Sequence, residues 1–287
     1  MRTAIVTDTN SGITKEEAKE EGIYLLPMPV IIDEEVCFEG ANLSQERFYE
    51  CLTGGKDVTT SQPAPADVMD LWDHVLEDGY DELVHIPMSS GLSNSWETAA
   101  GLSRDYDGKV MVVDNHRISV TLRESVLEAK RLADSGMTAE KIKEELEAAS
   151  YDASIYIVVD TLEYLKKGGR ITPAVAALGS VLNIKPVLTI QGGRLDTFAK
   201  VRGMKKAKTT AIEALRHDIE TRFPDVEKSR MRLAVAGAAL PPEDAKSWCT
   251  ALSEEFQMDV SYSPLSFSVA THTGPGAVGV AVTIARK

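Results

Sequence analysis

The stretch LVHIPMSSGLS at residues 83–93 joins a short apolar run to a loop dense in hydroxyl groups. Residues 83–86 have the length and composition of a strand that is buried on both faces of a parallel sheet. The segment that follows, residues 94–104, has helical periodicity. In open α/β sheets, ligands bind in the crevice beyond the carboxyl ends of the strands. The stretch therefore predicts an α/β fold in which residues 89–93 face a ligand.

The rest of the first half repeats this alternation of strands and helices. Apolar runs at residues 4–6 and 110–113 predict two more buried strands. Helical patterns occur at residues 15–21, 67–77 and 119–135. This order predicts a doubly wound, mostly parallel sheet. The run at residues 23–32 contains Pro27 and Pro29, which favours a sheet edge or an extended connector.

The second half has a different pattern. A helix that starts at Thr138 leads to a strand at residues 155–159, and residues 187–201 are typical of a hairpin that turns at Gly192 and Gly193. Because a hairpin pairs its strands antiparallel, we expect a mixed sheet with flanking helices. Long helices and further strands alternate after the hairpin, at residues 205–222, 233–236, 243–256, 259–262 and 278–284.

These patterns predict two α/β domains, residues 1–153 and 154–287, with a ligand between them. A chain of 287 residues is long enough for each domain to bury its own core. The net charge of -13 disfavours nucleic acid as a partner, because most of the surface would repel a phosphate backbone. A small anion can still bind where a few cations and N–H groups are focused in one cleft.

The cysteine content and the hydropathy of the sequence indicate the cellular compartment of the protein. Cys37, Cys51 and Cys249 are odd in number and widely spaced, which fits neither a disulfide framework nor a zinc site. No stretch approaches the length of a transmembrane helix, and the first apolar run is too short for a signal peptide. We therefore expect a cytoplasmic protein that needs no metal and no cofactor.

Hydroxyl groups cluster in two loops. Thr60 and Ser61 stand before one predicted helix, and Ser93 stands at the start of another. One hydroxyl suffices to cap a helix, so capping and ligand binding are comparable interpretations of these residues. Residues 8–12 (DTNSG) follow the first strand and open at the same edge of the sheet. We expect these loops to hold a small anion through hydroxyls and backbone N–H groups.

Two arginines and one histidine are further candidates. Arg170 follows a glycine pair, and Arg202 follows the hairpin. Cations and glycines also belong at helix ends, so a structural role and a role in the cleft or at a partner both stay open. His272 lies in the stretch THTGPGAVG at residues 271–279, which indicates a loop. A histidine held there can donate to a carboxylate, although a lone histidine is more often structural.

The sequence lacks several motifs of enzymatic chemistry. It has no P-loop Gly-Lys-Ser/Thr, no zinc-binding His-Glu-x-x-His and no Gly-x-Ser-x-Gly nucleophile elbow. Ser61 or Ser93 with His272 as base would make a nucleophile, but no third, orienting residue can be named. A binding protein is therefore favoured. The alternative is a phosphoryl-transfer or hydrolytic enzyme that holds phosphate in the same loops.

Taken together, these segments resemble the DegV family of bacterial fatty-acid-binding proteins, nearly from end to end. Six stretches in the family's order carry the resemblance: residues 8–12 (DTNSG), 60–63 (TSQP), 89–93 (SSGLS), 167–170 (KGGR), 201–203 (VRG) with 206–207 (KA), and 271–276 (THTGPG). The resemblance implies two α/β domains with a long-chain fatty acid between them, its tail in the C-terminal half. It also implies a separate fatty-acid kinase, which makes the acyl phosphate for phospholipid synthesis.

The resemblance also implies roles for particular residues. Thr60 and Ser93 would hydrogen-bond the carboxylate of the fatty acid, with Ser61 and His272 close by. One departure from the family is visible, because residues 94–96 are NSW where the family commonly has Gly-Thr-Tyr.

Arg170 and Arg202 would lie near the mouth of the cleft, against the head group or the kinase. Apolar candidates for the acyl channel are Leu178, Val181, Leu182, Ile184 and Leu188. We expect a monomer, and transient contact with a membrane surface stays open.

Overall fold

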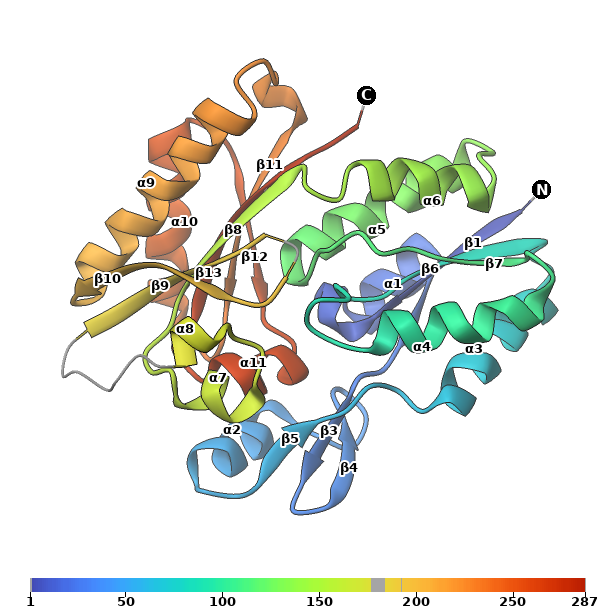
Figure 1. Ribbon diagram of the computed structural model, residues 1–287, viewed down its shortest axis with the longest axis horizontal. Helices are drawn as coiled ribbons and strands as arrows, with labels where there is room; N and C mark the ends of the chain where they lie inside the picture. Colours follow the sequence, from blue (N-terminus) through green and yellow to red (C-terminus); the bar gives the residue numbers. More distant parts are fainter. Residues whose placement is uncertain (1, 177–183, 192, 287) are drawn as a thin grey trace.

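The computed structural model describes residues 2–176, 184–191 and 193–286. Two large sheets lie side by side, and a small third sheet lies below them in the view of Figure 1. The four-stranded first sheet has the order β2-β1-β6-β7 and is parallel throughout. Its strands are β1 (Thr3–Asp8), β2 (Ile23–Leu26), β6 (Glu82–Ile86) and β7 (Val110–Val112). The predicted doubly wound, parallel N-terminal sheet is confirmed.

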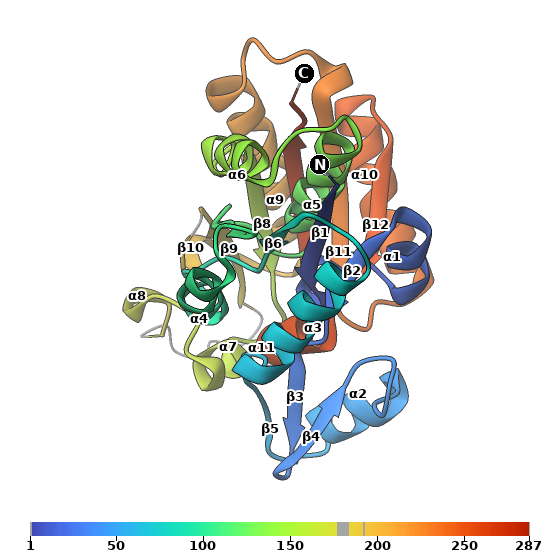
Figure 2. The same ribbon diagram turned by 90° about the vertical axis from the view of Figure 1, so that its right-hand side faces the viewer.

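Helices cover both faces of this first sheet (Figures 1 and 2). One face packs against α1 (Lys15–Glu21), α5 (Ser119–Asp134) and α6 (Ala139–Ala148). The other packs against α3 (Pro65–Glu77) and α4 (Ser95–Leu102). Short 3-10 turns follow β1 and α4, at η1 (Thr9–Ser11) and η2 (Ser103–Tyr106). Both faces of the parallel strands are therefore buried, as their apolar runs require.

The six-stranded second sheet has the order β10-β9-β8-β13-β11-β12. Its strands are β8 (Ala153–Val158), β9 (Ile184–Ile190), β10 (Asp196–Arg202), β11 (Met231–Gly237), β12 (Val260–Pro264) and β13 (Val278–Ile284). β11 and β12 are parallel and the other neighbouring pairs are antiparallel, so the sheet is mixed as predicted. β9 and β10 form the predicted antiparallel pair, although Gly192 of its turn lies outside the described residues.

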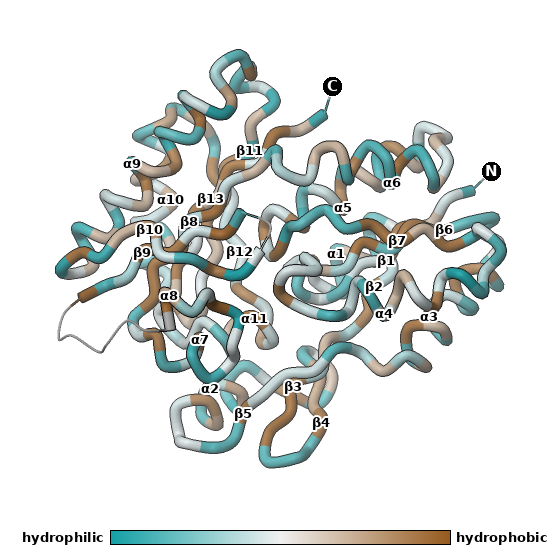
Figure 3. The backbone as a smooth tube through the Cα atoms, viewed as in Figure 1, coloured by the Kyte–Doolittle hydropathy of each residue, from teal (hydrophilic) through white to brown (hydrophobic). Residues whose placement is uncertain are grey.

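The helices of the second half divide between the two faces of this sheet. The long helices α9 (Met204–Arg222) and α10 (Pro242–Phe256) cover the outer face, and η3 (Lys228–Arg230) precedes β11. Three short helices lie on the inner side, at α7 (Glu163–Gly168), α8 (Pro173–Ala176) and α11 (Phe267–Thr273). In Figure 3, α9 alternates between hydrophilic and hydrophobic residues, whereas β8, β11 and β13 are largely hydrophobic. This is the pattern of an amphipathic helix on a buried sheet.

The third sheet was not predicted. It is antiparallel, with the order β4-β3-β5, and consists of β3 (Pro29–Ile32), β4 (Glu35–Phe38) and β5 (Val58–Thr60) beside α2 (Gln45–Thr53). The single edge or connector predicted for residues 23–32 is therefore wrong in part. Residues 23–26 form the edge strand β2, but residues 29–32 form the middle strand of this separate sheet.

An aromatic contact fixes the third sheet against the second half of the chain. Phe48 of α2 stacks on Phe267 of α11, with ring centroids 4.5 Å apart and planes 6° apart. Both side chains are buried. The contact brings the end of β5, which carries Thr60, next to α11. Within the described ranges, no helix combines the length and the apolar character that a membrane span requires.

Candidate functional site

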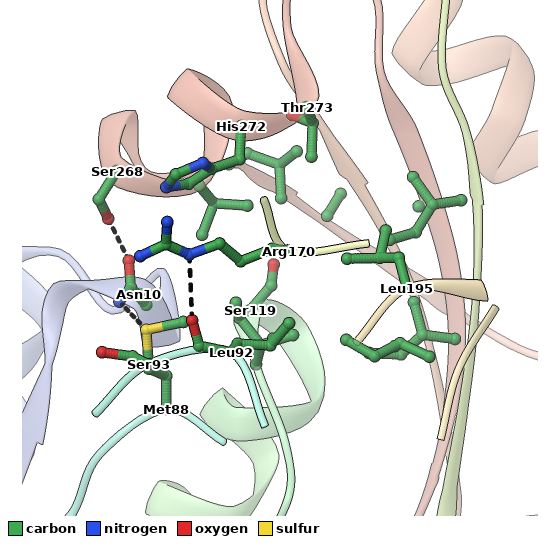
Figure 4. A pocket seen from close by; sticks show the side chains of 18 of the residues that line it. Asn10, Met88, Leu92, Ser93, Ser119, Arg170, Leu195, Ser268, His272 and Thr273 are labelled. Carbon is green, nitrogen blue, oxygen red and sulfur yellow. Dashed lines mark hydrogen bonds between the residues drawn. The ribbon is translucent and has the colours of Figure 1, made fainter. Parts of the chain in front are cut away.

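A deep cavity lies on the inner side of the six-stranded sheet, between that sheet and the N-terminal half of the chain. The cavity measures about 90 Å³, within about 920 Å³ of space that is free of protein atoms and includes open solvent at the mouth. Figure 4 shows Asn10, Ser93, Ser268 and His272 on one side of this cavity and apolar side chains around Leu195 on the other. The cavity is therefore polar at one end and apolar at the other.

The apolar end is built by the strands of the second sheet. Successive residues of a strand point to opposite faces, so alternate residues of β8, β11 and β13 lie on the cavity side of the sheet, and five of them line the cavity. Three of these positions carry little or no side chain: Ala236, Gly279 and Ala281. Isoleucine and leucine complete the wall, at Ile155, Ile157, Leu165, Ile190 and Leu195. The space exists because small residues occupy the middle of the sheet where larger ones would fill it.

The acyl-channel residues suggested by the sequence lie elsewhere or are not described. Leu178, Val181 and Leu182 fall outside the described residues. Leu188 is fully buried in the core on the cavity side of the sheet, and Ile184 is partly exposed at the start of β9. Neither of these two borders the cavity. The lining comes instead from the strands named above.

At the polar end, Thr60 and His272 meet across more than two hundred positions of sequence. Thr60 Oγ1 lies 2.8 Å from His272 Nε2. Burial lowers the pKa of His272 to about 4, and the positive charge of Arg170 acts in the same direction. The imidazole is therefore neutral at neutral pH. Its Nδ1 atom is buried, with no hydrogen-bond partner among the described residues.

The sequence placed His272 in a loop, and this prediction is wrong. His272 lies in the last turn of α11. Ser266 caps this helix by accepting from the N–H of Val269, and Gly274 ends it with a positive φ of 77°. The glycine-rich stretch begins only after the histidine. A short capped helix therefore holds the imidazole in place.

Gly168 leaves the room that this imidazole occupies. A Cβ atom added at Gly168 would lie 2.1 Å from His272 Nδ1, far inside van der Waals contact. Gly168 is the last residue of α7, and its backbone passes directly against the ring. The glycine pair of the sequence therefore has a steric function at the site as well as ending the helix.

The two candidate serines differ in their surroundings. Ser93 lines the cavity, and its Oγ accepts from the N–H of Ser95 and lies 2.8 Å from Ser95 Oγ. Ser61 also lines the cavity but is exposed. His272 is hydrogen-bonded to Thr60 and not to either serine. The serine and histidine pairing that a nucleophilic enzyme needs is therefore not formed.

The two candidate arginines are separated. Arg170 lines the cavity, and its guanidinium donates to the carbonyl of Leu92 at 3.3 Å through Nε and to the carbonyl of Gly168 through Nη1. Arg202 is exposed at the end of β10 and does not border the cavity. Of these two arginines, only Arg170 lies close enough to contact a molecule in the cavity.

Asn10 joins the two halves of the chain at the polar end, a role that the sequence did not single out within residues 8–12. Its Oδ1 accepts from Ser266 at 3.1 Å and from Ser268, both next to or in α11. Its Nδ2 donates to the sulfur of Met88 at 2.8 Å (Figure 4). The feature of the sequence that could have pointed to Asn10 is its place in the polar loop directly after β1, at the carboxyl edge of the sheet.

Beneath Asn10, a buried carboxylate holds two loops together. Asp8 accepts from the backbone N–H of Asn10 at 2.9 Å and of Met88 at 2.9 Å. Burial raises the pKa of Asp8 to about 6, although both hydrogen bonds act to lower it. Asp8 therefore positions two residues that line the cavity.

Little in this site suits a metal or a nucleotide. In the part of the chain that the structure describes, no three His, Cys, Asp or Glu side chains group closely enough to hold a metal ion. Gly274, Gly276 and Gly279 have the spacing of a dinucleotide fingerprint, but they lead from a helix into β13. That fingerprint needs a strand followed by a helix. The fold and the site define a small-molecule-binding α/β protein with a mostly apolar cavity.

The chain belongs to the DegV family, whose model is described as that of an uncharacterised protein and matches residues 2–285. A DegV domain-containing protein of Deinococcus radiodurans is 34% identical over 283 residues, which cover 98% of each chain. A second such protein, from Streptomyces coelicolor, is 30% identical over 286 residues and 98% of each chain. These relatives are bacterial.

Solved structures share the whole fold. One is a DegV family protein from Thermus thermophilus that is described as binding fatty acid. It is 30% identical to this chain, with a TM-score of 0.85, and the match covers 99% of this chain and 100% of that one. DegV from Bacillus subtilis, described as a fatty acid binding protein, is also 30% identical with a TM-score of 0.85, covering 99% of both chains.

Proposed function

We propose that this protein binds one long-chain fatty acid between residues 1–153 and residues 154–287. The observation that carries the proposal is the polarity of the cavity, which is apolar over the sheet and ends at uncharged hydroxyls, a neutral imidazole and one arginine. A molecule with a long apolar tail and a single carboxylate matches this distribution. Two similar structures described as fatty acid binding support the same ligand class.

The tail supplies the driving force. Burial of methylenes is worth roughly 0.8 kcal/mol each, so a sixteen-carbon tail is worth on the order of 12 kcal/mol before the costs of association. Those costs are about 4–15 kcal/mol. The wall of Ala236, Gly279 and Ala281 leaves the room for the tail. Binding therefore depends on this wall more than on any single polar contact.

The polar end fixes which end of the ligand points outward. A carboxylate that leaves water needs hydrogen bonds to offset its desolvation. Thr60 and Ser93 each bring a hydroxyl to the cavity, and the cation of Arg170 lies beside them. The neutral His272 keeps Thr60 Oγ1 in place. We assign the carboxylate to Thr60 and Ser93, with Ser61 and His272 as neighbours.

We further propose that a separate kinase receives this carboxylate and forms an acyl phosphate. The chain itself has no P-loop, and its histidine contacts Thr60 and neither serine, which disfavours a self-sufficient phosphoryl-transfer or hydrolytic enzyme. Ser61 is exposed at the mouth of the cavity, where a partner can approach. Arg202, which is exposed and away from the cavity, is assigned to this partner.

Mass spectrometry of extracted lipid tests the binding proposal. Protein purified from a bacterial host and extracted with organic solvent should release about one fatty acid per chain. Delipidated protein should then take up palmitate or oleate in a calorimetric titration. If neither lipid co-purifies nor either acid binds, the protein is not a fatty-acid carrier.

A double variant tests the assignment of the head group. Thr60→Ala with Ser93→Ala removes two hydrogen bonds to a charged group, each worth about 1.5–3 kcal/mol, so binding should weaken at least tenfold. Acyl-phosphate formation with a fatty-acid kinase should fall as well. Thr221→Ala with Ser135→Ala is the control, because both hydroxyls are exposed and remote from the cavity. Equal turnover by the two double variants would remove the assignment.

We also propose that the protein acts as a cytoplasmic monomer. Cys37 and Cys51 are buried free thiols, and Cys249 is also unpaired, as suits a reducing compartment. Light scattering on the eluting protein should give the mass of one chain, 31.2 kDa. A mass of twice that value at micromolar concentration would contradict a monomer.

A further inference from the structure

A second cavity lies away from the first, where α5 and α6 meet the end of β13 and the start of β11 (Figure 1). It measures about 430 Å³ and shares no lining residue with the cavity described above. Four arginines line it: Arg117, Arg131, Arg232 and Arg286. In a chain with a net charge of -13, this is an unusual concentration of cations.

Arg117 is the innermost of the four and is only 5% exposed. Its guanidinium donates to Ser125 Oγ at 2.8 Å, to the carbonyl of Ala149 at 2.5 Å and to the carbonyl of Ser150 at 3.5 Å. All three acceptors are uncharged. Burial lowers the pKa of Arg117 to about 10, so the group stays charged at neutral pH.

A buried charge normally has a counter-ion, because the loss of hydration is otherwise not offset. Arg117 has no carboxylate within 4.0 Å among the described residues. The charges of Asp152, Glu124 and Glu128 act on it only from beyond ion-pair distance. The wall of this cavity therefore contains a cation that lacks an ionic partner.

Two of the other arginines at the cavity have carboxylate partners. Arg131 pairs with Glu128, and Nε of Arg286 lies 3.8 Å from Glu145. Glu128 lines the cavity, as does Glu124, whose pKa is raised by burial. The lining therefore holds four guanidinium groups and two carboxylates, and the charges of Arg232 and Arg117 act to lower the pKa of Glu124 against the effect of burial.

Arg232 is exposed and has no carboxylate partner within the described ranges. Its Nη1 donates to the carbonyls of Ser229 at 2.8 Å and Met231 at 3.0 Å. The remaining donors of its planar guanidinium stay open to a ligand. Planar guanidinium groups with several N–H donors suit phosphate oxygens, which accept bonds in several directions.

We propose that this arginine-lined cavity binds a phosphate group, free or carried by a small organic molecule. Arg117 forms the buried end of the site, and Arg232 closes it from the solvent side. The phosphate supplies the counter-ion that Arg117 lacks. This site is independent of the fatty-acid site, because the two cavities have no lining residue in common.

The test is calorimetric titration of the full-length protein with inorganic phosphate and with phenyl phosphate, at low and constant ionic strength. One saturable site per chain is expected for at least one of the two, with chloride at the same ionic strength producing no such signal. Tighter binding of phenyl phosphate would indicate a phosphomonoester, and tighter binding of inorganic phosphate would indicate the free ion. Absence of saturable binding for both would overturn the proposal.

Variants locate the site. Arg232→Gln combined with Arg131→Gln should weaken phosphate binding at least tenfold, and both positions are exposed, so the fold should be kept. Arg216→Gln is the matched control, because this arginine lies on α9 in an ion pair with Glu255. Equal weakening by the control would show that only general charge is sensed and would contradict the site.

Discussion

The two faces of the six-stranded sheet differ in how their side chains fill space. Towards α9 and α10, β13 presents Val278, Val280 and Val282, each at most 1% exposed, and the helices pack onto them. Towards the N-terminal half, the same strand presents Gly279 and Ala281, and a cavity lies above them. One strand thus supports a packed core on one face and an open cavity on the other.

The cavity therefore consists largely of missing side-chain volume on one face of the sheet. Close packing is the normal state of a protein interior, and voids larger than a water molecule are few. A glycine in the middle of a strand usually weakens it, because glycine loses more conformational freedom and has no side chain to pack. At Gly279, φ is not positive, and an added Cβ would meet nothing closer than 3.9 Å. The backbone does not require this glycine, and its effect is to leave space in the cavity.

The largest expected effect is on the packed face. Leu215 of α9 is fully buried against the valines of the sheet. Leu215→Ala should lower the free energy of unfolding by about 2–5 kcal/mol, because a cavity replaces packed atoms. Urea denaturation of the purified variant measures this value. Fatty-acid affinity of the folded fraction should stay unchanged, and a parallel loss of affinity would break the separation of the two faces.

The next effect concerns Asp8, below the polar end of the cavity. Burial raises its pKa from 3.8 to about 6, so the folded state holds a proton that the unfolded state has released between these pH values. Stability should therefore fall as pH rises from about 4 to about 6, by on the order of 3 kcal/mol from this group. Asp8→Asn should lack this slope in denaturation measured against pH. Two curves of identical slope would refute the contribution of Asp8.

On the cavity face, filling the space should change ligand preference and leave stability nearly constant. Gly279→Leu adds four carbons where the tail would lie, which displaces about four methylenes at roughly 0.8 kcal/mol each. Palmitate should bind about 200-fold more weakly, and decanoate should bind as before. Val280→Leu is the control one residue away. It should cost stability by overpacking the helix face without changing chain-length preference.

The smallest expected effect is at the polar end. Gly168→Ala would place a methyl group 2.1 Å from His272 Nδ1, so the imidazole must move and its hydrogen bond with Thr60 should be lost. Fatty-acid binding should weaken about tenfold, corresponding to roughly one hydrogen bond. Gly101→Ala in α4 is the control, because nothing lies within 4 Å of the added atom. Comparable affinities for the two variants would show that His272 does not position Thr60.

The sequence predicted the elements with strong hydrophobic patterns. β7 is an uninterrupted apolar run, and β6 is apolar except for Glu82 and His85. β9 with β10 has the alternation and the glycine turn of a hairpin, so both sheets were anticipated. The third sheet was missed because its strands are only three or four residues long and β4 is largely exposed. Val36 of β4 is 49% exposed, and the turn before it uses a positive φ at Asp33, which no turn signature announces.

The residues around the cavity were predicted in part, and their role in binding stays a prediction. Thr60, Ser61, Ser93, Arg170 and His272 all border the cavity, and each stands in a stretch that is unusually polar for its position. The apolar wall was placed around residues 178–188, because large aliphatic side chains were taken as the signal for a channel. The opposite signal, small residues alternating with valine in VGVAV at residues 278–282, marks the cavity. This alternation indicates a cavity only when it is known which face of the sheet the small residues of β13 occupy.

The most direct test of the central claim is a crystal structure with palmitate that carries bromine on its terminal carbon. We expect an anomalous peak for bromine beside Gly279 and Ala281, with the carboxylate within hydrogen-bond distance of Thr60 and Ser93. Bromine at the mouth of the cavity, or side chains that fill the space above Gly279, would contradict it.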